Sequence, residues 1–472
     1  MMSPRDSHAI VVGGSMAGLL AARALVEHFG RVTIVDRDAF PTSPDYRKGV
    51  PQSPHAHVLL ARGQLLLERF FPGLVSELRD QDAVPLMAPQ DMLALTPMGW
   101  AMRSSPRPLG LLSCSRELLE FNVRRRLTRS TAIGLIEESD VVGLIPGNDG
   151  TSIDGVRLRR RGGDRAADAT EDLRGALVVD ASGRDSRMPE WLRAIGYDTP
   201  AETKVVSHAG YASRYYARPT GFVADWKVLF FLPSVGSPRG GVLFPIEGER
   251  WLVTLVGVGG DFPPTDEEGF LAFSRTLRTP ILHDVISRSK PLSAPRGFRR
   301  TDNVRRAYEQ LRRWPDGLIV TGDAACTFNP VYGQGMSVCA IEASELSRAL
   351  VGRGKELRFA HTLQRHLARA NSAPWQLATA ADLAYPTTEG TRRGGVSRII
   401  SRYIERLQTV AIQDPVVASA FRYVTHLLSP PLSLFAPNIV VRVLAPRTIR
   451  RRDEPPMRMS FAPGTITSRE AP

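Results

Sequence analysis

The sequence lacks several features that would place it in a specialised class. Its 472 residues include only three cysteines, Cys114, Cys326 and Cys339, which are widely spaced and form neither a CxxC motif nor a disulfide framework. No apolar run approaches the ~20 residues of a membrane-spanning helix, and residues 1–7 are too few and too polar for a secretory signal. These absences favour a cytoplasmic protein in a reducing environment.

Lysine is scarce as well: only five are present, so arginine supplies nearly all of the positive charge, and the formal net charge is +13. A basic balance can reflect binding to nucleic acid, contact with an anionic membrane or an arginine-rich genome. The arginine runs, for example 124–126 and 450–452, are scattered and are not interleaved with aromatic residues that could stack on bases. We therefore expect no nucleic-acid partner.

Residues 8–36 combine a strand, a glycine turn, a helix and a second strand that ends in an acid. The apolar run 9–12 is typical of a parallel strand buried on both faces, and the helix start would expose backbone N–H groups to a pyrophosphate. Asp36 stands where dinucleotide-binding folds place the carboxylate that binds the adenosine ribose. The predicted cofactor contacts in this unit are Gly13, Gly14, Ser15, Met16, Ala17, Gly18, Asp36 and Arg37.

Ser15 departs from the GxGxxG pattern at the usual second glycine. A tight turn without a ligand is the alternative interpretation of this segment. Flavoproteins usually carry such a unit near the start of the chain, which favours FAD over NAD.

A second glycine-rich segment, residues 318–345, contains a strand, Gly322-Asp323, a loop and a long helix. It resembles the GD…PxxGxG segment of the FAD-dependent aromatic hydroxylase superfamily. This resemblance implies that Asp323 binds the ribityl side of FAD and that the following loop faces the pyrimidine end of the flavin. A helix N-terminus there would stabilise the negative charge of a reduced flavin by roughly 0.3–1 kcal/mol. The predicted contacts are Asp323, Pro330, Gly333, Gln334, Gly335 and Met336.

Three further pieces carry a closer resemblance: RKGVPQSPHAHVLLARG from Arg47, NPVYGQGM from Asn329 and FPIEGERWLVTL from Phe244. In sequence and order they are similar to the flavin-dependent polyene epoxidases of polyether ionophore biosynthesis, of the lasalocid and monensin type, and more loosely to squalene epoxidase. The resemblance covers roughly residues 9–350. It also implies that Arg47 contacts the cofactor and that Arg116, at a helix start, reaches the FAD phosphates.

The segment LVVDASGRDSRMPEWL, residues 177–192, has Ser182-Gly183 where aromatic hydroxylases commonly have Asp-Gly. Its DAxGxxS form is similar to halogenases, prenyl reductases and epoxidases of the same superfamily. The resemblance implies that electrons come from NAD(P)H by one of two routes. Nicotinamide binds transiently over the flavin, or a separate flavin reductase is the partner, and Ser182-Gly183 favours the second.

The predicted fold is α/β: a Rossmann-like FAD-binding domain, an antiparallel-sheet substrate domain and a C-terminal helical region. The expected boundaries are 1–83, 113–195 and 296–352 for FAD binding, 84–112 and 196–295 for substrate, 353–452 for the helices and 453–472 for a disordered tail. The pattern predicts a helix over 55–71 and strands over 211–216, 226–232, 240–245 and 251–258.

Aromatic residues along the predicted substrate sheet are candidates to line a pocket. They are Tyr211, Phe230, Phe244 and Trp251, for each of which a place in the core is the alternative. His55 and His57 have no third ligand nearby in the sequence, so no metal site is predicted. The apolar residues 432–444 and the basic stretch after them suggest either a helical cap over the active site or a peripheral membrane contact.

The resemblance implies an FAD-dependent monooxygenase that activates O2 as a flavin C4a-hydroperoxide. Epoxidation needs no protein nucleophile, so no catalytic side chain is predicted, and the expected substrate is a large apolar polyene, polyketide or terpenoid of secondary metabolism. Hydroxylation of an aromatic polyketide is the alternative. A halogenase is less favoured, because the stretch 240–245 lacks the tryptophans of a WxWxIP segment. A non-catalytic basic adaptor would explain the charge but not the cofactor segments.

Overall fold

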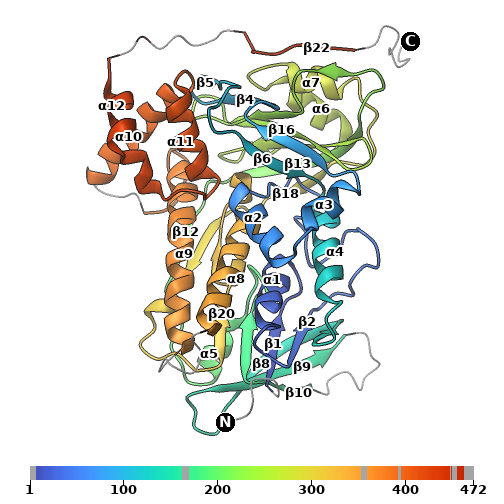
Figure 1. Ribbon diagram of the computed structural model, residues 1–472, viewed down its shortest axis with the longest axis vertical. Coiled ribbons are helices and arrows are strands. Elements are labelled where there is room, and N and C mark those ends of the chain that lie inside the picture. The colour runs from blue at the N-terminus through green and yellow to red at the C-terminus, as the bar shows by residue number, and fades with distance from the viewer. Residues whose placement is uncertain are drawn as a thin grey trace.

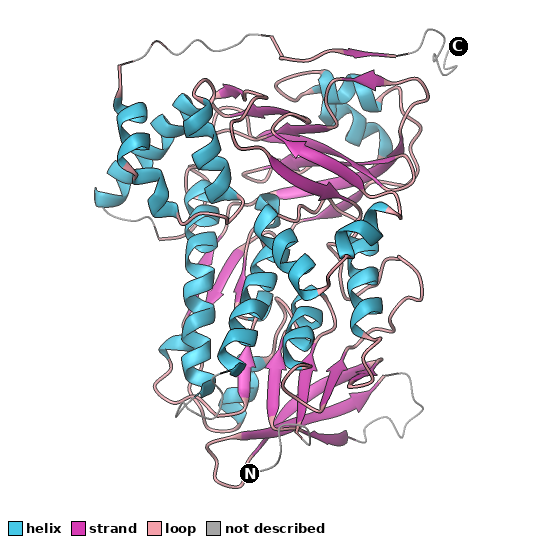
Figure 2. Cartoon of the chain, viewed as in Figure 1, coloured by secondary structure: helices cyan, strands magenta, loops and turns pink. Residues whose placement is uncertain are grey.

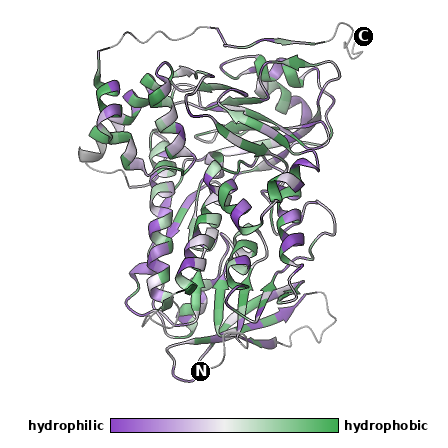
Figure 3. Ribbon diagram, viewed as in Figure 1, coloured by the Kyte–Doolittle hydropathy of each residue, from purple (hydrophilic) through white to green (hydrophobic). Residues whose placement is uncertain are grey.

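A five-stranded parallel sheet, with strand order β20-β11-β1-β2-β7, underlies the lower half of the molecule in Figure 1. The computed structural model describes residues 7–161, 170–351, 359–391, 395–446, 448 and 454–461, without the side chains of 395–398. The strands are β1 His8–Val12, β2 Arg31–Val35, β7 Ile133–Ile136, β11 Leu177–Asp180 and β20 Leu318–Val320. Residues 9–12 of the central strand are buried, as their apolar run predicts, and Figure 3 shows the apolar colouring of this sheet.

Helices cover this sheet, and α1 packs directly against α8 (Figure 2). The helices of this half are α1 Met16–Leu25, α2 Ala61–Phe70, α3 Leu74–Arg79, α4 Arg116–Leu127, α5 Met188–Ala194, α8 Gly335–Val351 and α9 Phe359–Asp382. A three-stranded meander adjoins them, formed by β8 Ser139–Pro146, β9 Ile153–Arg160 and β10 Thr170–Arg174. The arrangement matches the predicted Rossmann-like layer, because strands distant in sequence meet in one parallel sheet.

A seven-stranded sheet of order β18-β13-β17-β16-β15-β4-β5 occupies the upper half, antiparallel except between β15 and β4. Its strands are β4 Met92–Thr96, β5 Gly99–Trp100, β13 Gly210–Ala217, β15 Val228–Phe231, β16 Arg239–Ile246, β17 Arg250–Gly257 and β18 Arg296–Phe298. Helices α6 Glu267–Arg275 and α7 Ile281–Ile286 pack on one face, and the other face is turned toward α2. The four predicted strands are present, and β18 extends the sheet past residue 295.

Shorter elements connect the two halves. They are β3 Val84–Ala88 paired with β6 Leu109–Ser113, the sheet of β12 Glu202–Val205, β19 Asn303–Arg306 and β21 Cys326–Thr327, and the 3-10 turns η3 Tyr308–Gln310, η4 Gly322–Ala324 and η5 Pro330–Tyr332. The prediction of a helix over 55–71 is wrong in its first part. Residues 55–60 precede α2 because His55 and the Ala56 N–H are bonded to side chains of the seven-stranded sheet instead.

The predicted C-terminal region, 353–452, is helical, but its first helix, α9, packs against α8 in the lower half. The elements that follow lie beside the seven-stranded sheet and are α10 Gly395–Ala411, α11 Pro415–Thr425, η6 Pro431–Phe435 and α12 Pro437–Leu444. Within the part of the chain that is described, no helix combines the length and the apolar character needed to cross a membrane.

The expected disordered tail is partly wrong. Residues 454–461 are ordered along the substrate domain, where β22 Met459–Ser460 pairs with β14 Val223–Ala224. Phe461 contacts the ring of Phe222, which gives this segment an apolar anchor that its proline-rich sequence does not reveal. Residues 453 and 462–472 of the predicted tail lie outside the described residues.

Candidate functional site

The turn after β1 is tightly packed, and two of its glycines are required by space. Gly13 has φ +98°, and a Cβ built on it would lie 2.5 Å from the carbonyl oxygen of Ala181. A Cβ on Gly18 would lie 1.8 Å from the Gly13 carbonyl oxygen, so α1 approaches the turn only because no side chain is there. Helix α1 therefore starts close to the end of β1 and directs its first backbone N–H groups to this edge of the sheet.

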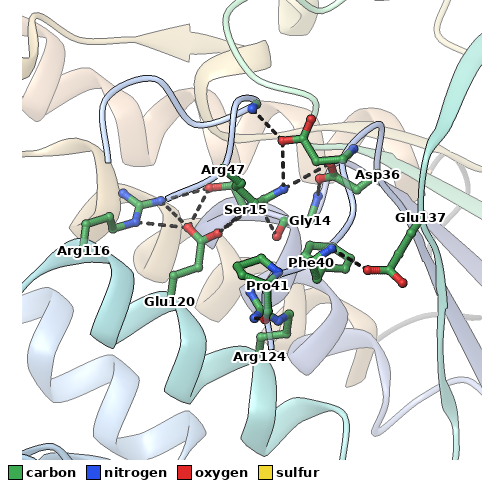
Figure 4. Close-up of polar contacts among 12 residues, drawn as sticks. Gly14, Ser15, Asp36, Phe40, Pro41, Arg47, Arg116, Glu120, Arg124 and Glu137 are labelled. Atoms are coloured by element: carbon green, nitrogen blue, oxygen red, sulfur yellow. Dashed lines mark hydrogen bonds and ion pairs between the residues drawn. The ribbon is translucent and has the colours of Figure 1, made fainter. Parts of the chain in front are cut away.

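A buried carboxylate, Glu120, joins this turn to two arginines (Figure 4). Its oxygens accept hydrogen bonds from Arg47 Nη2 and Arg116 Nη2, each at 2.9 Å. Ser15 Oγ donates to Glu120 at 3.0 Å and accepts from Arg116 at 2.9 Å, so the residue in place of the second glycine has defined partners. Burial alone would raise the pKa of Glu120, but Arg116 and Arg47 outweigh burial and lower the pKa. The carboxylate therefore holds both arginines beside the turn.

Asp36 ends β2 on the other side of the same turn. Its carboxylate accepts from the Gly14 N–H at 2.6 Å and the Asp38 N–H at 2.9 Å, and lies 3.1 Å from Arg47 Nη1. We call Ser15, Asp36, Arg47, Arg116 and Glu120 the turn cluster. The sequence analysis predicted the other four of these residues as cofactor contacts and missed Glu120. The predicted contact Arg37 is exposed and lies outside the cluster.

The second predicted segment lies against the first. Gly322, with φ +61°, leaves only 2.7 Å between a built Cβ and the Cβ of Ala17 in α1, so η4 abuts α1. Burial raises the pKa of the neighbouring Asp323, and the positive charge of Arg184 acts in the opposite direction. The loop then reaches the start of α8, where a Cβ on Gly335 would meet no atom within 4 Å.

Two buried carboxylates fix the ends of this second segment. Glu342 accepts from the Thr321 hydroxyl at 2.9 Å and from the Gly322 N–H at 2.7 Å. Asp382, at the end of α9, accepts from Asn329 at 3.0 Å and from the Tyr332 hydroxyl at 2.7 Å. Both ends of the segment that the sequence assigned to the flavin ring are thus held by acids that the sequence analysis did not single out.

The DAxGxxS segment has a structural role beside the turn. Asp180 is fully buried and accepts from the Ser182 N–H at 3.0 Å and the Ser186 hydroxyl at 2.5 Å. These bonds close the loop that carries Ala181, the residue on which Gly13 packs. Gly183 in this loop has φ +87° and open space where a side chain would be.

The alternation of side chains along the seven-stranded sheet corrects one predicted pocket residue. Phe230 and Phe244 lie with Val58 on the face turned toward α2. Trp251 is on the opposite face, where its ring contacts Phe222 beneath α6 and α7. Neighbouring residues of a strand point to opposite faces of the sheet. Trp251 points to the face away from α2 and is therefore a core residue.

A buried polar chain on the α2-facing side was not predicted. His55 Nδ1 lies 2.8 Å from Ser213 Oγ, which lies 2.6 Å from Thr254 Oγ1. The predicted pocket residue Tyr211 is on the same face, with its ring edge-on to His55 at 4.8 Å between centroids. Burial, with a smaller effect of Arg296, lowers the pKa of His55 to about 4, so the imidazole is neutral at pH 7. The chain ties the segment that carries Arg47 to the substrate sheet.

His426 gives the protein an acid-sensitive contact between α11 and α2. Its Nδ1 accepts from the Ala61 N–H at 3.2 Å, and burial together with Arg422 lowers the pKa of His426 to about 4. Because the unfolded chain binds this proton near pH 6.5, stability should fall as the pH is lowered from about 6.5 toward 4. We expect His426→Gln, which keeps an acceptor but cannot titrate, to lose less thermal stability over this range. Equal slopes of melting temperature against pH in variant and wild type would contradict the assignment.

The residues present fit FAD. The turn cluster offers two guanidinium groups and a helix N-terminus, the donors that a diphosphate requires, and the Asp36 carboxylate is the kind of acceptor that a ribose hydroxyl requires. At the other end, Gln334 is buried and its Oε1 has no hydrogen-bond partner, next to the open space at Gly335. A small cavity is lined in part by Arg116 of the turn cluster and by Met336 at the start of α8. Such an unsatisfied buried oxygen is expected where a polar ligand binds.

Comparison with known proteins supports the fold. No family profile matches the chain. The curated protein Rv3254 of Mycobacterium tuberculosis is 29% identical over 424 residues, which cover 89% of each chain.

Several solved structures share this architecture. A flavoprotein/dehydrogenase from Cytophaga hutchinsonii gives a TM-score of 0.64 at 15% identity, covering 92% of this chain and 96% of that one. The flavin-dependent halogenase CmlS gives 0.61 at 20% identity (87% and 74% covered), and the p-nitrophenol 4-monooxygenase PnpA of Pseudomonas putida gives 0.60 at 17% (90% and 98% covered). The chain therefore has the aromatic-hydroxylase-like fold that flavin-dependent monooxygenases and halogenases share.

Proposed function

We propose that the protein is an FAD-dependent monooxygenase that epoxidises an alkene of a large apolar polyene, polyketide or terpenoid. The proposal is supported by the paired arginines of the turn cluster, by the open space at the start of α8 and by the apolar sheet face at Phe230 and Phe244. FAD would be held at its diphosphate by Arg47 and Arg116 and at its pyrimidine end by the backbone around Gly335. When bound and reduced, it would supply the oxygen chemistry.

The protein itself would position the substrate and exclude water from it. The sheet face at Phe230 and Phe244 is apolar, and a second apolar cluster beside it includes Met92 of β4 and Tyr423 of α11. A long hydrocarbon could lie along this surface with its double bond toward the start of α8. The neutral imidazole of His55 adds no charge to this surface.

Hydroxylation of an aromatic polyketide is the second candidate, favoured by the likeness to PnpA. Phenol hydroxylation benefits from a base that ionises the ring hydroxyl. Burial raises the pKa of Tyr211 well above its usual range and lowers that of His55 to about 4, so neither group matches a base poised near neutral pH. Epoxidation needs no such group and remains first.

Halogenation is supported by the likeness to CmlS but less by the residues. It would need a buried amine between cofactor and substrate, and the four lysines in the described ranges, Lys48, Lys204, Lys227 and Lys290, are exposed.

The proposal is tested by supplying purified protein with FAD, a reducing system, O2 and a panel of polyenes and phenols. Products are then analysed by mass spectrometry with labelled O2. One labelled oxygen gained without loss of hydrogen identifies epoxidation or hydroxylation, and the position of the label separates them. Parallel reactions with chloride and bromide test halogenation. A protein that binds no flavin would contradict every version of the proposal.

The electron source gives a separate prediction. A second dinucleotide-binding unit was not found in the sequence, and Asp180 is already bonded within its own loop. We therefore expect NADPH or NADH alone to reduce the bound FAD slowly under anaerobic conditions, with little stimulation by substrate. Addition of a flavin reductase should restore turnover. Rapid, substrate-stimulated reduction by NADPH alone in stopped-flow traces would place the protein with the single-component hydroxylases.

A further inference from the structure

We propose that the outer surface of α10, η6 and α12 docks on an anionic membrane. Large hydrophobic side chains gather on these three elements and are exposed to solvent. They are Ile399 (70% exposed), Ile400 (47%), Leu432 (79%), Phe435 (40%), Val441 (69%) and Leu444 (59%), which we call the C-terminal apolar face. Elsewhere in the described chain, exposed large hydrophobic residues occur singly in separate segments, as is usual on soluble proteins.

Contacts between the three elements hold them, and the side chains they carry, in one rigid unit. The Tyr403 hydroxyl of α10 donates to the Leu434 carbonyl at 2.7 Å, and its ring stacks on Phe435 at 4.8 Å between centroids. Arg406 Nε, one turn further along α10, donates to the Val443 carbonyl of α12 at 2.8 Å. Ile399 lies one turn before Tyr403 on the same side of α10. Figure 1 shows α10 and α12 at the outer edge of the molecule.

The net positive charge of this region favours an anionic lipid surface over a second copy of the chain as the partner of the apolar face. Residues 395–446 contain five arginines and two acids, a difference of three positive charges. One of the acids, Asp414, is buried and paired with Arg442 at 3.1 Å, whereas Arg402 is exposed beside the apolar face. Two copies meeting through this face would bring like charges together, but anionic headgroups would meet the exposed Arg402 and Arg406 while the aliphatic side chains enter the interface.

The position of the face connects it to the substrate side of the molecule. Helix α11 packs against α10 and α12, and its Tyr423 belongs to the apolar cluster with Met92 and Leu111 beside the sheet. If the proposed function is correct, an apolar substrate dissolved in lipid would have a short path to that cluster. The docking itself does not depend on FAD or on turnover.

The test is flotation of the full-length protein with vesicles of phosphatidylcholine alone or of equal parts phosphatidylcholine and phosphatidylglycerol. We expect binding to the anionic vesicles that weakens with salt. The double variant Leu432→Ser/Val441→Ser should lower the vesicle affinity at least about tenfold, and Arg402→Gln about fivefold. The matched control Leu65→Ser/Val223→Ser removes one leucine and one valine that are exposed elsewhere, 57% and 63%, and should bind like the wild type.

Several outcomes would overturn the docking proposal without touching the oxygenase proposal. Absence of flotation with anionic vesicles is one, and equal loss in the control variant is another. Concentration-dependent dimerisation that Leu432→Ser/Val441→Ser abolishes, with no vesicle binding, would assign the face to a second copy instead. All variants alter exposed positions, and their melting temperatures confirm that the fold is kept.

Discussion

Gly335→Val is expected to fold like the wild type and to lose FAD-dependent turnover by roughly a hundredfold or more, the scale on which a small displacement of reacting groups acts. The retained fold and the lost turnover have separate causes. A Cβ at Gly335 meets no protein atom within 4 Å, so the unliganded protein can accommodate the side chain. The same space is where the proposed flavin edge would meet the N-terminus of α8, and two methyl groups would displace it.

The measurement pairs thermal unfolding of the flavin-free variant with FAD titration and turnover. An unchanged melting temperature together with weak or altered flavin binding is the expected signature. Gly143→Val is the matched control, since a Cβ there also meets nothing within 4 Å but the residue lies in β8 of the meander. Full turnover with a normal flavin spectrum in Gly335→Val would show that the loop does not contact the ring.

The sequence predicted correctly those elements whose residue pattern is compatible with only one local structure. The run 9–12 is apolar at every position, which only a strand buried on both faces explains, and it is the central strand of the parallel sheet. Ser115 before Arg116 predicts a helix start, and its side chain accepts from the Leu118 N–H. The glycines of the first turn were predicted for the same reason, since the strand-turn-helix connection leaves no room for side chains.

Residues that depend on distant partners could not be predicted in the same way. Glu120 lies four residues after Arg116, a spacing usual for a surface ion pair on a helix. Its role follows from Arg47, which the chain brings to it across 73 residues. The prediction that Trp251 lines the pocket was wrong for a related reason. Alternation separates the two faces of a strand, but only the packing of α6 and α7 decides which face becomes core. The start of α2 was misplaced because His55 is bonded to another domain's sheet.

Asp36→Ala is expected to weaken FAD binding by about ten- to a hundredfold, the effect of losing a charge-assisted hydrogen bond of roughly 1.5–3 kcal/mol. In the protein, the carboxylate orients the Gly14 N–H and Arg47, so its loss would disturb the turn as well as remove the acceptor proposed for the ribose. Affinity for FMN, which lacks the adenosine half, should change much less. Isothermal titration of both flavins into flavin-free protein measures the difference.

A matched pair of variants makes the test of Asp36 specific. Asp36→Asn keeps the size and one acceptor oxygen and should fall between wild type and Asp36→Ala, because the charge and the second acceptor oxygen are lost. Asp140→Ala removes a carboxylate that pairs with Arg161 at 2.8 Å on β8 and should leave FAD affinity unchanged. Recovery of FMN instead of FAD from the native protein, or equal FAD affinity in Asp36→Ala and wild type, would remove the basis for placing adenosine at the end of β2. A selective loss of FAD affinity would instead assign Asp36 to the adenosine half of the cofactor, since FMN shares the ring, the ribityl chain and one phosphate with FAD but lacks that half.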